Sequence, residues 1–100
     1  MKTLTGLSEP ILNLDGEVLR EINGKEITVG SIIANSLARG SSEEPVRAMD
    51  VAIKIHNANG DIELEDADFA LAERAVKEDR LINNMAKAAA LSALNGRPGP

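Results

Sequence analysis

The near-absence of aromatic side chains limits the hydrophobic core that this chain can build. Phe69 is the only aromatic residue among 100, and the chain has no cysteine. Aromatic side chains bury about 150–250 Å² each and usually dominate the energetics of a core, so a core of Ala, Leu, Ile and Val is thin. The length suits one domain, which buries roughly two-thirds of its unfolded surface. We therefore expect one small domain that gains stability from association with a partner or with itself.

The same composition excludes several classes of function. Without cysteine there is no thiolate for a zinc finger, an iron–sulfur cluster or a redox pair. With a single ring there is no stacking platform for nucleic-acid bases. A net charge of −5 opposes attraction to phosphate backbones and anionic membranes. We find no signal peptide and no apolar run near the ~20 residues of a membrane span. We expect a cytoplasmic protein that does not bind nucleic acid directly and does not bind membranes.

Two turn signals in the first third of the chain predict a β-hairpin. Asp15-Gly16 and Asn23-Gly24 are typical of tight turns, because Gly, Asn and Asp tolerate positive φ. We interpret residues 11–14 and 17–20 as a pair of antiparallel strands joined by the first turn. Residues 25–27 are a candidate third strand after the second turn.

A helix is predicted directly after this hairpin. Thr28 can cap its N-terminus, and the helix runs to about Arg39. Gly40 follows at the position where a left-handed residue commonly ends a helix. Apolar residues recur at helical spacing and define the face that we expect to be buried: Val29, Ile32, Ile33 and Leu37.

A second helix is predicted over about residues 43–56. Ser41 and Glu44 have the spacing of a capping box, and Pro45 is tolerated in a first turn. The stripe that we expect to be buried continues to His56, which we interpret as structural because no nucleophile or orienting acid stands in a catalytic pattern with it. The other members of the stripe are Val46, Met49 and Ile53, with Ala52 beside them.

The last third of the chain also predicts helix. Residues 61–64 alternate between polar and apolar and suit a short extended stretch, and Asp66 then caps a helix over about residues 67–77. The polar run after this helix is a break, with Asp79 as the next cap before a helix over about residues 80–94. The expected buried residues are Phe69, Ala72 and Val76 in the first of these helices, and Leu81 or Ile82 with Met85, Ala88, Ala89 and Leu91 in the second.

Together these elements predict an α+β fold, in which an N-terminal β-hairpin packs on three or four short helices. The helices after Gly60 are either one bent helix or two separate ones. We expect residues 1–96 to form a single domain that ends at the helix stop Gly96. Residues 97–100 are Arg-Pro-Gly-Pro, which cannot continue a helix, so we expect a disordered tail.

Five carboxylates fall within residues 61–68 and suggest a calcium site. An EF-hand loop needs Gly at its sixth position, where the chain turns sharply. A loop that starts at Asp61 has Asp66 at that position, and one that starts at Asn57 has Ile62. Both registers fail. We interpret the cluster as solvated charge at the start of a helix, where carboxylates complement the helix dipole, and expect no metal site.

Motifs for nucleotides and for DNA are also missing. Neither GxGxxG nor GxxxxGK[ST] occurs, so a phosphate-binding loop has no support. Two helices around Gly40 are the arrangement of a helix-turn-helix motif, which places its second helix in the major groove. That second helix carries three acidic residues against two basic ones, and it would meet DNA phosphates poorly.

One resemblance places these elements in a biological setting. At residues 14–16, 23–30 and 34–37 the chain resembles a group of small phage and prophage proteins, in which a short apolar LDG hairpin leads into the pattern GKxxTxGxxxxNxL. A helix like residues 52–55 and an acidic stretch like residues 63–66 follow. The resemblance covers roughly residues 10–95 and implies a phage or prophage gene product that works inside a bacterial cell. The group has no agreed activity, so no functional residue is transferred.

The leading hypothesis is a non-enzymatic protein-interaction module, with no catalytic residue, cofactor or metal. Two roles stay open: an assembly or adaptor factor in the phage cycle, or an inhibitor of a host protein. The expected partner is a phage or host protein, a second copy of the chain, or both. The residues that we expect to meet it are Asn35 and Arg39 on the first helix, and Glu63, Glu65, Asp66 and Asp68 in the acidic segment, residues 63–68.

A second hypothesis is a small-ligand or nucleotide-binding sponge that forms at an oligomer interface. Arginine forks can grip phosphate groups across a symmetry axis without a motif that is readable in one chain. The candidate residues are Arg47, Arg74 or Arg80, together with backbone amides. The oligomeric state and a bound small molecule discriminate between the two hypotheses.

Overall fold

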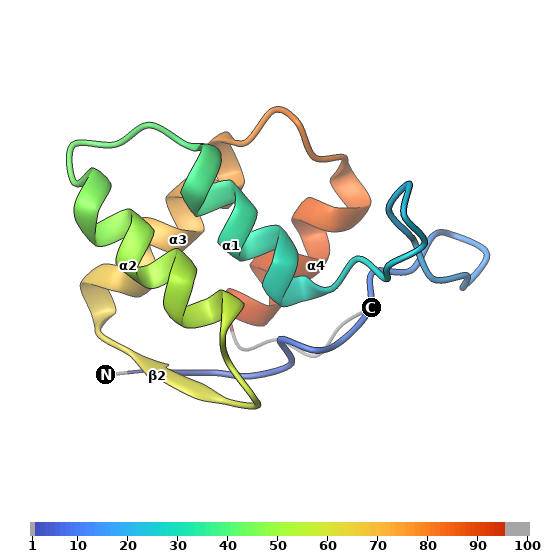
Figure 1. The fold of residues 1–100 in the computed structure, drawn as a ribbon, viewed down its shortest axis with the longest axis horizontal. Coiled ribbons are helices and arrows are strands. Elements are labelled where there is room, and N and C mark those ends of the chain that lie inside the picture. Colours follow the sequence, from blue (N-terminus) through green and yellow to red (C-terminus); the bar gives the residue numbers. More distant parts are fainter. Residues whose placement is uncertain (1, 96–100) are drawn as a thin grey trace.

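Four helices and two short strands are the regular elements of the computed structural model, which describes residues 2–95 (Figure 1). They confirm the predicted α+β class. Gly96 and residues 97–100, for which the sequence predicts a helix stop and a disordered tail, lie outside the described residues. In chain order the elements are β1 (Lys2–Leu4), α1 (Val29–Arg39), α2 (Pro45–His56), β2 (Ile62–Leu64), α3 (Asp66–Glu78) and α4 (Asn84–Leu94).

Helix α1 is the central helix, and its start and its buried face are as predicted. The Thr28 side chain accepts a hydrogen bond from the backbone N–H of Ser31, and the Ser31 hydroxyl accepts one from the backbone N–H of Thr28. This capping box satisfies two donors that a helix start would otherwise leave free. The predicted stripe is buried, and α1 contacts each of the other three helices.

The end of α1 differs from the prediction. Gly40 has a φ of −68° and an extended backbone, so it is not left-handed. Its N–H donates to the Ser36 carbonyl, and a Cβ at this position would lie 3.0 Å from the same oxygen. Glycine therefore serves a close approach of two backbone segments here, which lets the chain leave α1 directly toward α2.

Helix α2 begins at Pro45, and the predicted capping box does not form. Glu44 is the N-cap residue and makes no side-chain hydrogen bond to the helix. The Ser42 hydroxyl instead accepts a hydrogen bond from the Glu44 N–H at 3.3 Å, within the loop. Pro45 sets the start, because it has no N–H to satisfy and its fixed φ suits the first helical position.

The buried face of α2 is the other side of the helix from the one predicted. Val46, Met49 and Ile53 are 75%, 43% and 51% exposed, and His56 is exposed too. Both faces carry apolar residues at helical spacing, so the periodicity admits either. Alanines on the buried face let α2 approach α1 closely, and this packing decides between them. The buried residues of α2 are Ala48, Val51, Ala52 and Ile55.

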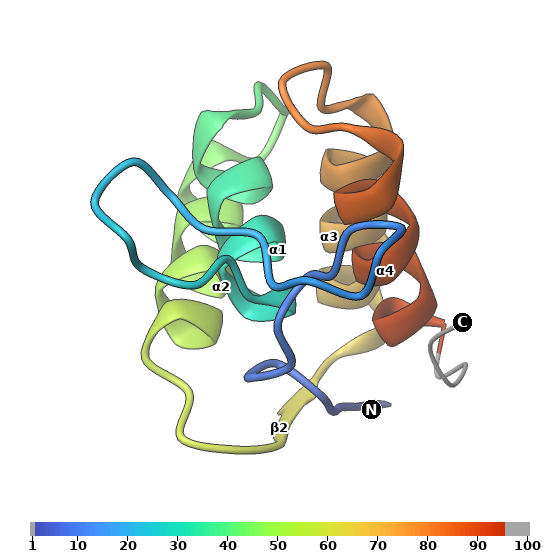
Figure 2. The same cartoon turned by 90° about the vertical axis from the view of Figure 1, so that its right-hand side faces the viewer.

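Helices α3 and α4 form a second layer that faces α1 and α2 (Figure 2). On α3, Phe69, Ala72 and Val76 are buried as predicted. The N-cap is Glu65, so Asp66 is the first residue of the helix and not its cap. The chain after Gly60 therefore holds two separate helices joined by a loop over residues 79–83.

Helix α4 starts later than predicted. Its cap is Asn83, whose side-chain oxygen accepts a hydrogen bond from the Ala86 N–H at 2.9 Å. Asp79, the predicted cap, is bound to side chains of α1 instead, so the chain crosses from α3 to α4 as a loop. The later start changes the buried face: Ala86, Ala90 and Leu94 are buried, Ile82, Met85, Ala89 and Leu91 are partly buried, and Leu81 and Ala88 are exposed.

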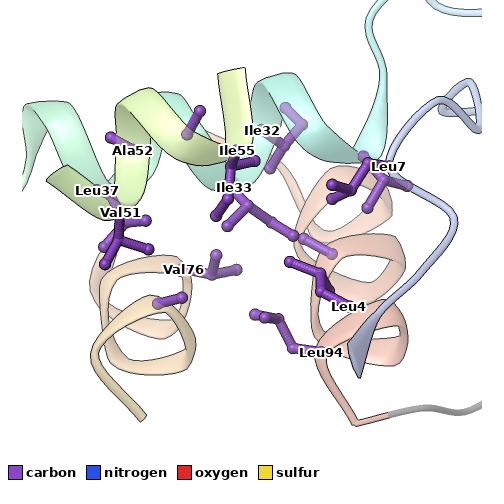
Figure 3. Close-up of a cluster of buried hydrophobic side chains, with 14 of the residues drawn as sticks. Leu4, Leu7, Ile32, Ile33, Leu37, Val51, Ala52, Ile55, Val76 and Leu94 are labelled. Carbon is purple, nitrogen blue, oxygen red and sulfur yellow. The ribbon is translucent and has the colours of Figure 1, made fainter. Parts of the chain in front are cut away.

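The core lies between the two layers and is made of aliphatic side chains together with Phe69. Figure 3 shows Ile33 of α1 among side chains that come from the other layer and from the N-terminus, including Leu4, Val76 and Leu94. Ile33, Leu4 and Val76 are completely buried. A core with a single ring, that of Phe69, is thus closed by aliphatic side chains from all parts of the chain.

A two-stranded sheet attaches the N-terminus to the helices. Strand β1 pairs antiparallel with β2, and Lys2 lies opposite Leu64. The extended stretch at residues 61–64 was predicted, but its partner was not, because the two strands are nearly 60 residues apart. The pairing places Leu4 and Leu64 in the core.

Residues 9–29 form a ring of three antiparallel bridges, which we call the cloverleaf. The bridges pair Leu12 with Val18, Arg20 with Glu26, and Pro10 with Thr28. At the centre the backbone N–H groups of three residues donate to one another's carbonyls in a closed cycle, with N···O distances of 2.8–2.9 Å. These residues are Ile11, Leu19 and Ile27, which are spaced by eight, so the three pairs are related by an approximate threefold axis.

The cloverleaf contains the predicted hairpin and the candidate third strand, each as a single bridge and not as a longer ladder. Three pairs that share one axis can each extend for only a residue or two. The first pair and the second pair end in turns that we call the first arm (residues 12–18) and the second arm (residues 20–26). The glycines of both predicted turns, Gly16 and Gly24, have positive φ values of 82° and 86°.

Candidate functional site

The acidic segment, residues 63–68, lies against one flank of α2. The Arg47 guanidinium hydrogen bonds to the Asp68 carboxylate and, at 3.3 Å, to Glu65. The Lys54 ammonium donates to the backbone carbonyl of Glu63 at 2.7 Å. The hydrogen bond to Asp68, followed by the charge of that carboxylate, raises the pKa of Arg47 above its ordinary value. Two cations of α2 therefore fasten the segment to the helix.

The predicted partner-binding residues fall into two groups that the fold keeps apart. Glu63 lies in β2, and Glu65, Asp66 and Asp68 lie at the start of α3; Asp68 is half-buried and the other three are exposed. Asn35 and Arg39 are exposed on α1, and Arg39 binds Asp79 just beyond the end of α3. Helix α3 has 13 residues, so roughly 20 Å of helix separates the two groups.

The acidic segment has an apolar neighbour that the sequence analysis had assigned to the core. Val46, Met49 and Ile53 lie on the face of α2 that points away from the core. Arg47 and Lys54, on the flank of the same helix, hold the acidic segment beside this face. We call the three apolar residues the α2 stripe. The stripe and the acidic segment thus form one continuous surface, apolar at its centre and acidic along one border.

A cavity of about 290 Å³ lies at the opposite end of α3 and is lined by residues of the loops that follow α1 and α3. These two loops are at the top of Figure 2. Apolar side chains of Leu37, Leu71 and Ala75 form part of its wall. Arg74 and Arg80 line it as well, and neither forms an ion pair with any residue between 2 and 95. We call this cavity the arginine pocket.

A buried polar network stands beside the arginine pocket. Ser36 is 1% exposed, and its hydroxyl donates to the Asp79 carboxylate at 2.7 Å. The same carboxylate accepts hydrogen bonds from the Arg39 guanidinium and from the backbone N–H of Leu81. Burial alone would raise the pKa of Asp79, but these hydrogen bonds and the charge of Arg39 outweigh it, so the pKa is lowered. Asp79 is therefore ionised and fully engaged at neutral pH.

The sequence analysis missed this network and the pocket beside it. Arg39 and Asp79 were each noticed, one as a partner-binding residue and the other as a helix cap. Ser36 and Asp79 are separated by 43 positions in the sequence. The one local signal was Ser36 itself, a polar residue between buried positions of an apolar helix face.

Among residues 2–95, no three His, Asp or Glu side chains lie close enough together to hold a metal ion. None of the described helices is long and apolar enough to cross a membrane. Comparison with protein-family models, curated proteins and solved structures finds no match for the chain.

Proposed function

We propose that this chain is a non-catalytic protein-interaction module that docks through the α2 stripe and the adjoining acidic segment. The observation that carries the proposal is the exposure of the stripe: three large apolar side chains lie in water on one helix face. A fold with a thin core would be expected to bury them, as the sequence analysis assumed. Apolar residues that gather on a surface commonly mark a protein interface.

The chemistry of this surface describes the partner that it fits. The centre of an interface is usually apolar and its rim polar, and buried apolar anchors supply most of the binding energy. Here Met49 is the central anchor, and the carboxylates of Glu63 and Glu65 stand on the rim. The surface therefore suits an apolar patch or helix that is bordered by Lys or Arg.

The setting of this interaction is part of the proposal. The LDG turn and the GKxxTxGxxxxNxL pattern resemble small phage and prophage proteins. A module of this kind acts in the cytoplasm of a host bacterium, either as an assembly or adaptor factor of the phage or as an inhibitor of a host protein. Both roles require one saturable docking surface and no turnover.

The test is a comparison of matched surface variants. The tagged chain is used to capture partners from a bacterial lysate, and the captured protein is then purified and its affinity measured by calorimetry. We expect M49S together with I53S to weaken binding at least about tenfold, roughly 1.4 kcal/mol. The control is I22S, which removes an apolar side chain that is more exposed than Met49 or Ile53 and lies on the second arm, outside the α2 stripe. A partner that binds the M49S/I53S double variant as tightly as it binds I22S and the wild type would contradict the proposal.

The second candidate function, a sponge for small anionic ligands, is favoured by one observation. Arg74 and Arg80, two of the three arginines proposed for it, line the same pocket, whereas Arg47 is bound to acidic side chains. Unpaired guanidinium groups are suited to phosphate and carboxylate groups. Native mass spectrometry of the purified chain tests this candidate. The candidate requires a small molecule that is bound to the wild type and is absent from the R74A variant.

A further inference from the structure

The tips of the two arms hold the most exposed apolar side chains of the described residues. Leu14 is 96% exposed and Ile22 is 110% exposed, so neither contacts the rest of the molecule. The turn that carries Leu14 is rigid: the Asn13 side chain accepts hydrogen bonds from the N–H groups of Asp15 and Glu17, and the Gly16 N–H donates to the Asn13 carbonyl. A side chain presented on an ordered turn loses little conformational freedom when it binds.

The two arms have the same fold but differ in charge. The first arm presents Leu14 with two carboxylates beside it, Asp15 and Glu17. At the equivalent positions of the second arm, Ile22 is followed by the neutral Asn23 and by a lysine, Lys25. The first arm is therefore an apolar tip whose charged residues are all acidic, whereas the tip of the second arm has both Glu21 and Lys25 beside it.

The arginine pocket is complementary to the first arm. Its wall includes the apolar side chains of Leu37 and Leu71. Among its charged groups, Arg39 and Asp79 form an ion pair and neutralise each other. The remaining charged groups are two arginines and one carboxylate, Glu78, so the pocket is positive. An apolar side chain fits the wall, and carboxylates beside it would meet Arg74 and Arg80 in charge-assisted hydrogen bonds.

The first arm cannot reach the pocket of its own chain. The cloverleaf leads into the N-terminus of α1, and the arms stand away from the helices at the right of Figure 1. The arginine pocket is at the C-terminal end of the same helix. Helix α1 has 11 residues, so about 16 Å of helix lies between them. Contact between arm and pocket must join two copies.

We propose that the first arm of one copy inserts Leu14 into the arginine pocket of a second copy, with Asp15 and Glu17 facing Arg74 and Arg80. The two surfaces differ from each other, so the contact is head-to-tail and leaves one arm and one pocket free at the ends. Such contacts close into a ring or continue as a filament. Neither the α2 stripe nor the acidic segment takes part, so the inference goes beyond the proposed function.

The experiment measures the mass of the purified full chain by sedimentation velocity and light scattering, from about 10 µM to 1 mM, the range of weak protein contacts. We expect the average mass to rise with concentration. L14S and R74E should each weaken association at least about tenfold, which is roughly 1.4 kcal/mol. E17R combined with R74E should restore part of the loss, because the charges are exchanged and not removed.

Matched controls make the outcome specific to the first arm. I22S removes the equivalent side chain of the second arm and should leave association within about twofold of the wild type. Circular dichroism checks that each variant is folded, as expected for side chains in solvent. The proposal is overturned by a chain that stays monomeric up to 1 mM, by association that L14S does not change, or by association that M49S abolishes. It is also overturned if R74E loses a bound small molecule but associates with other copies as strongly as the wild type does.

Discussion

At the scale of single residues, the buried hydroxyl of Ser36 is the clearest departure from an aliphatic core. It is the only buried polar residue within residues 2–95. It is tolerated because Asp79 accepts its hydrogen bond, and Asp79 in turn is held by Arg39 and by the Leu81 backbone. A buried polar group costs free energy when it is unpaired, but a fully paired network favours one arrangement of the chain. This network joins α1 to the loop between α3 and α4.

Replacing Asp79 by Asn tests the network at this scale. We expect D79N to lower the free energy of unfolding by about 1–2 kcal/mol at pH 7, because hydrogen bonds to a charged acceptor are lost and Arg39 is partly solvated. The pKa of Asp79 is lowered in the folded chain from 3.8, so its stabilisation is complete above that pH and is lost as the pH falls through the folded pKa. Urea unfolding at a series of pH values should show the two proteins converging below about pH 4. A constant difference at every pH would contradict this origin.

At the scale of elements, the two helix starts of the first layer behave differently although both have capping sequences. Thr28 and Ser31 form a capping box, whereas Ser41 and Glu44 do not. We expect T28A to lower the free energy of unfolding by about 1 kcal/mol and S41A to change it by less than about 0.5 kcal/mol. Thermal unfolding of the two variants checks this. Equal losses would mean that the start of α2 is capped in solution by the side chain of Ser41.

The register of α2 is a second property of an element. Ile55 is buried and Ile53 is half-exposed on the α2 stripe. We expect I55A to cost about 2–4 kcal/mol, because it leaves a cavity in the core, and I53A to cost less than about 1 kcal/mol. The two substitutions remove the same atoms from opposite faces of one helix, two positions apart, so each is the control for the other. Urea unfolding measures both costs. If I53A costs more than I55A, the face of α2 that the sequence predicts is buried after all.

At the scale of the whole molecule, the N-terminal strand β1 covers one side of the core. Leu4 is completely buried, and β1 is held by its pairing with β2. We expect L4A to cost about 2–5 kcal/mol, which is a large part of the 5–15 kcal/mol that stabilises an ordinary domain. T3A, an exposed position on the same strand, should cost far less. Near-equal midpoints of urea unfolding for the two variants would show that β1 does not contribute to the core.

The predictions from sequence succeeded where the residues that determine a structural feature lie within one short segment. The N-cap at Thr28, the buried face of α1 and the turn glycines Gly16 and Gly24 are of this kind. The candidate site was predicted less well. The acidic segment is exposed and adjoins an apolar face, but Asn35 and Arg39 lie at the other end of the bundle. The eight-residue spacing of apolar residues in the cloverleaf was visible in the sequence, yet only the closed cycle of hydrogen bonds shows what it means.

What the sequence determined by itself is the presence of each helix, the cap of α1 and the two glycine turns, because helical periodicity, the Thr28 cap and the glycines act within three or four residues. The tertiary structure decided which apolar face of α2 is buried, which strand pairs with β2, and that Ser36 meets Asp79 across 43 positions. These outcomes depend on which surfaces pack most closely when the whole chain is compact. No local window holds that information, because both partners of each contact must already be in place.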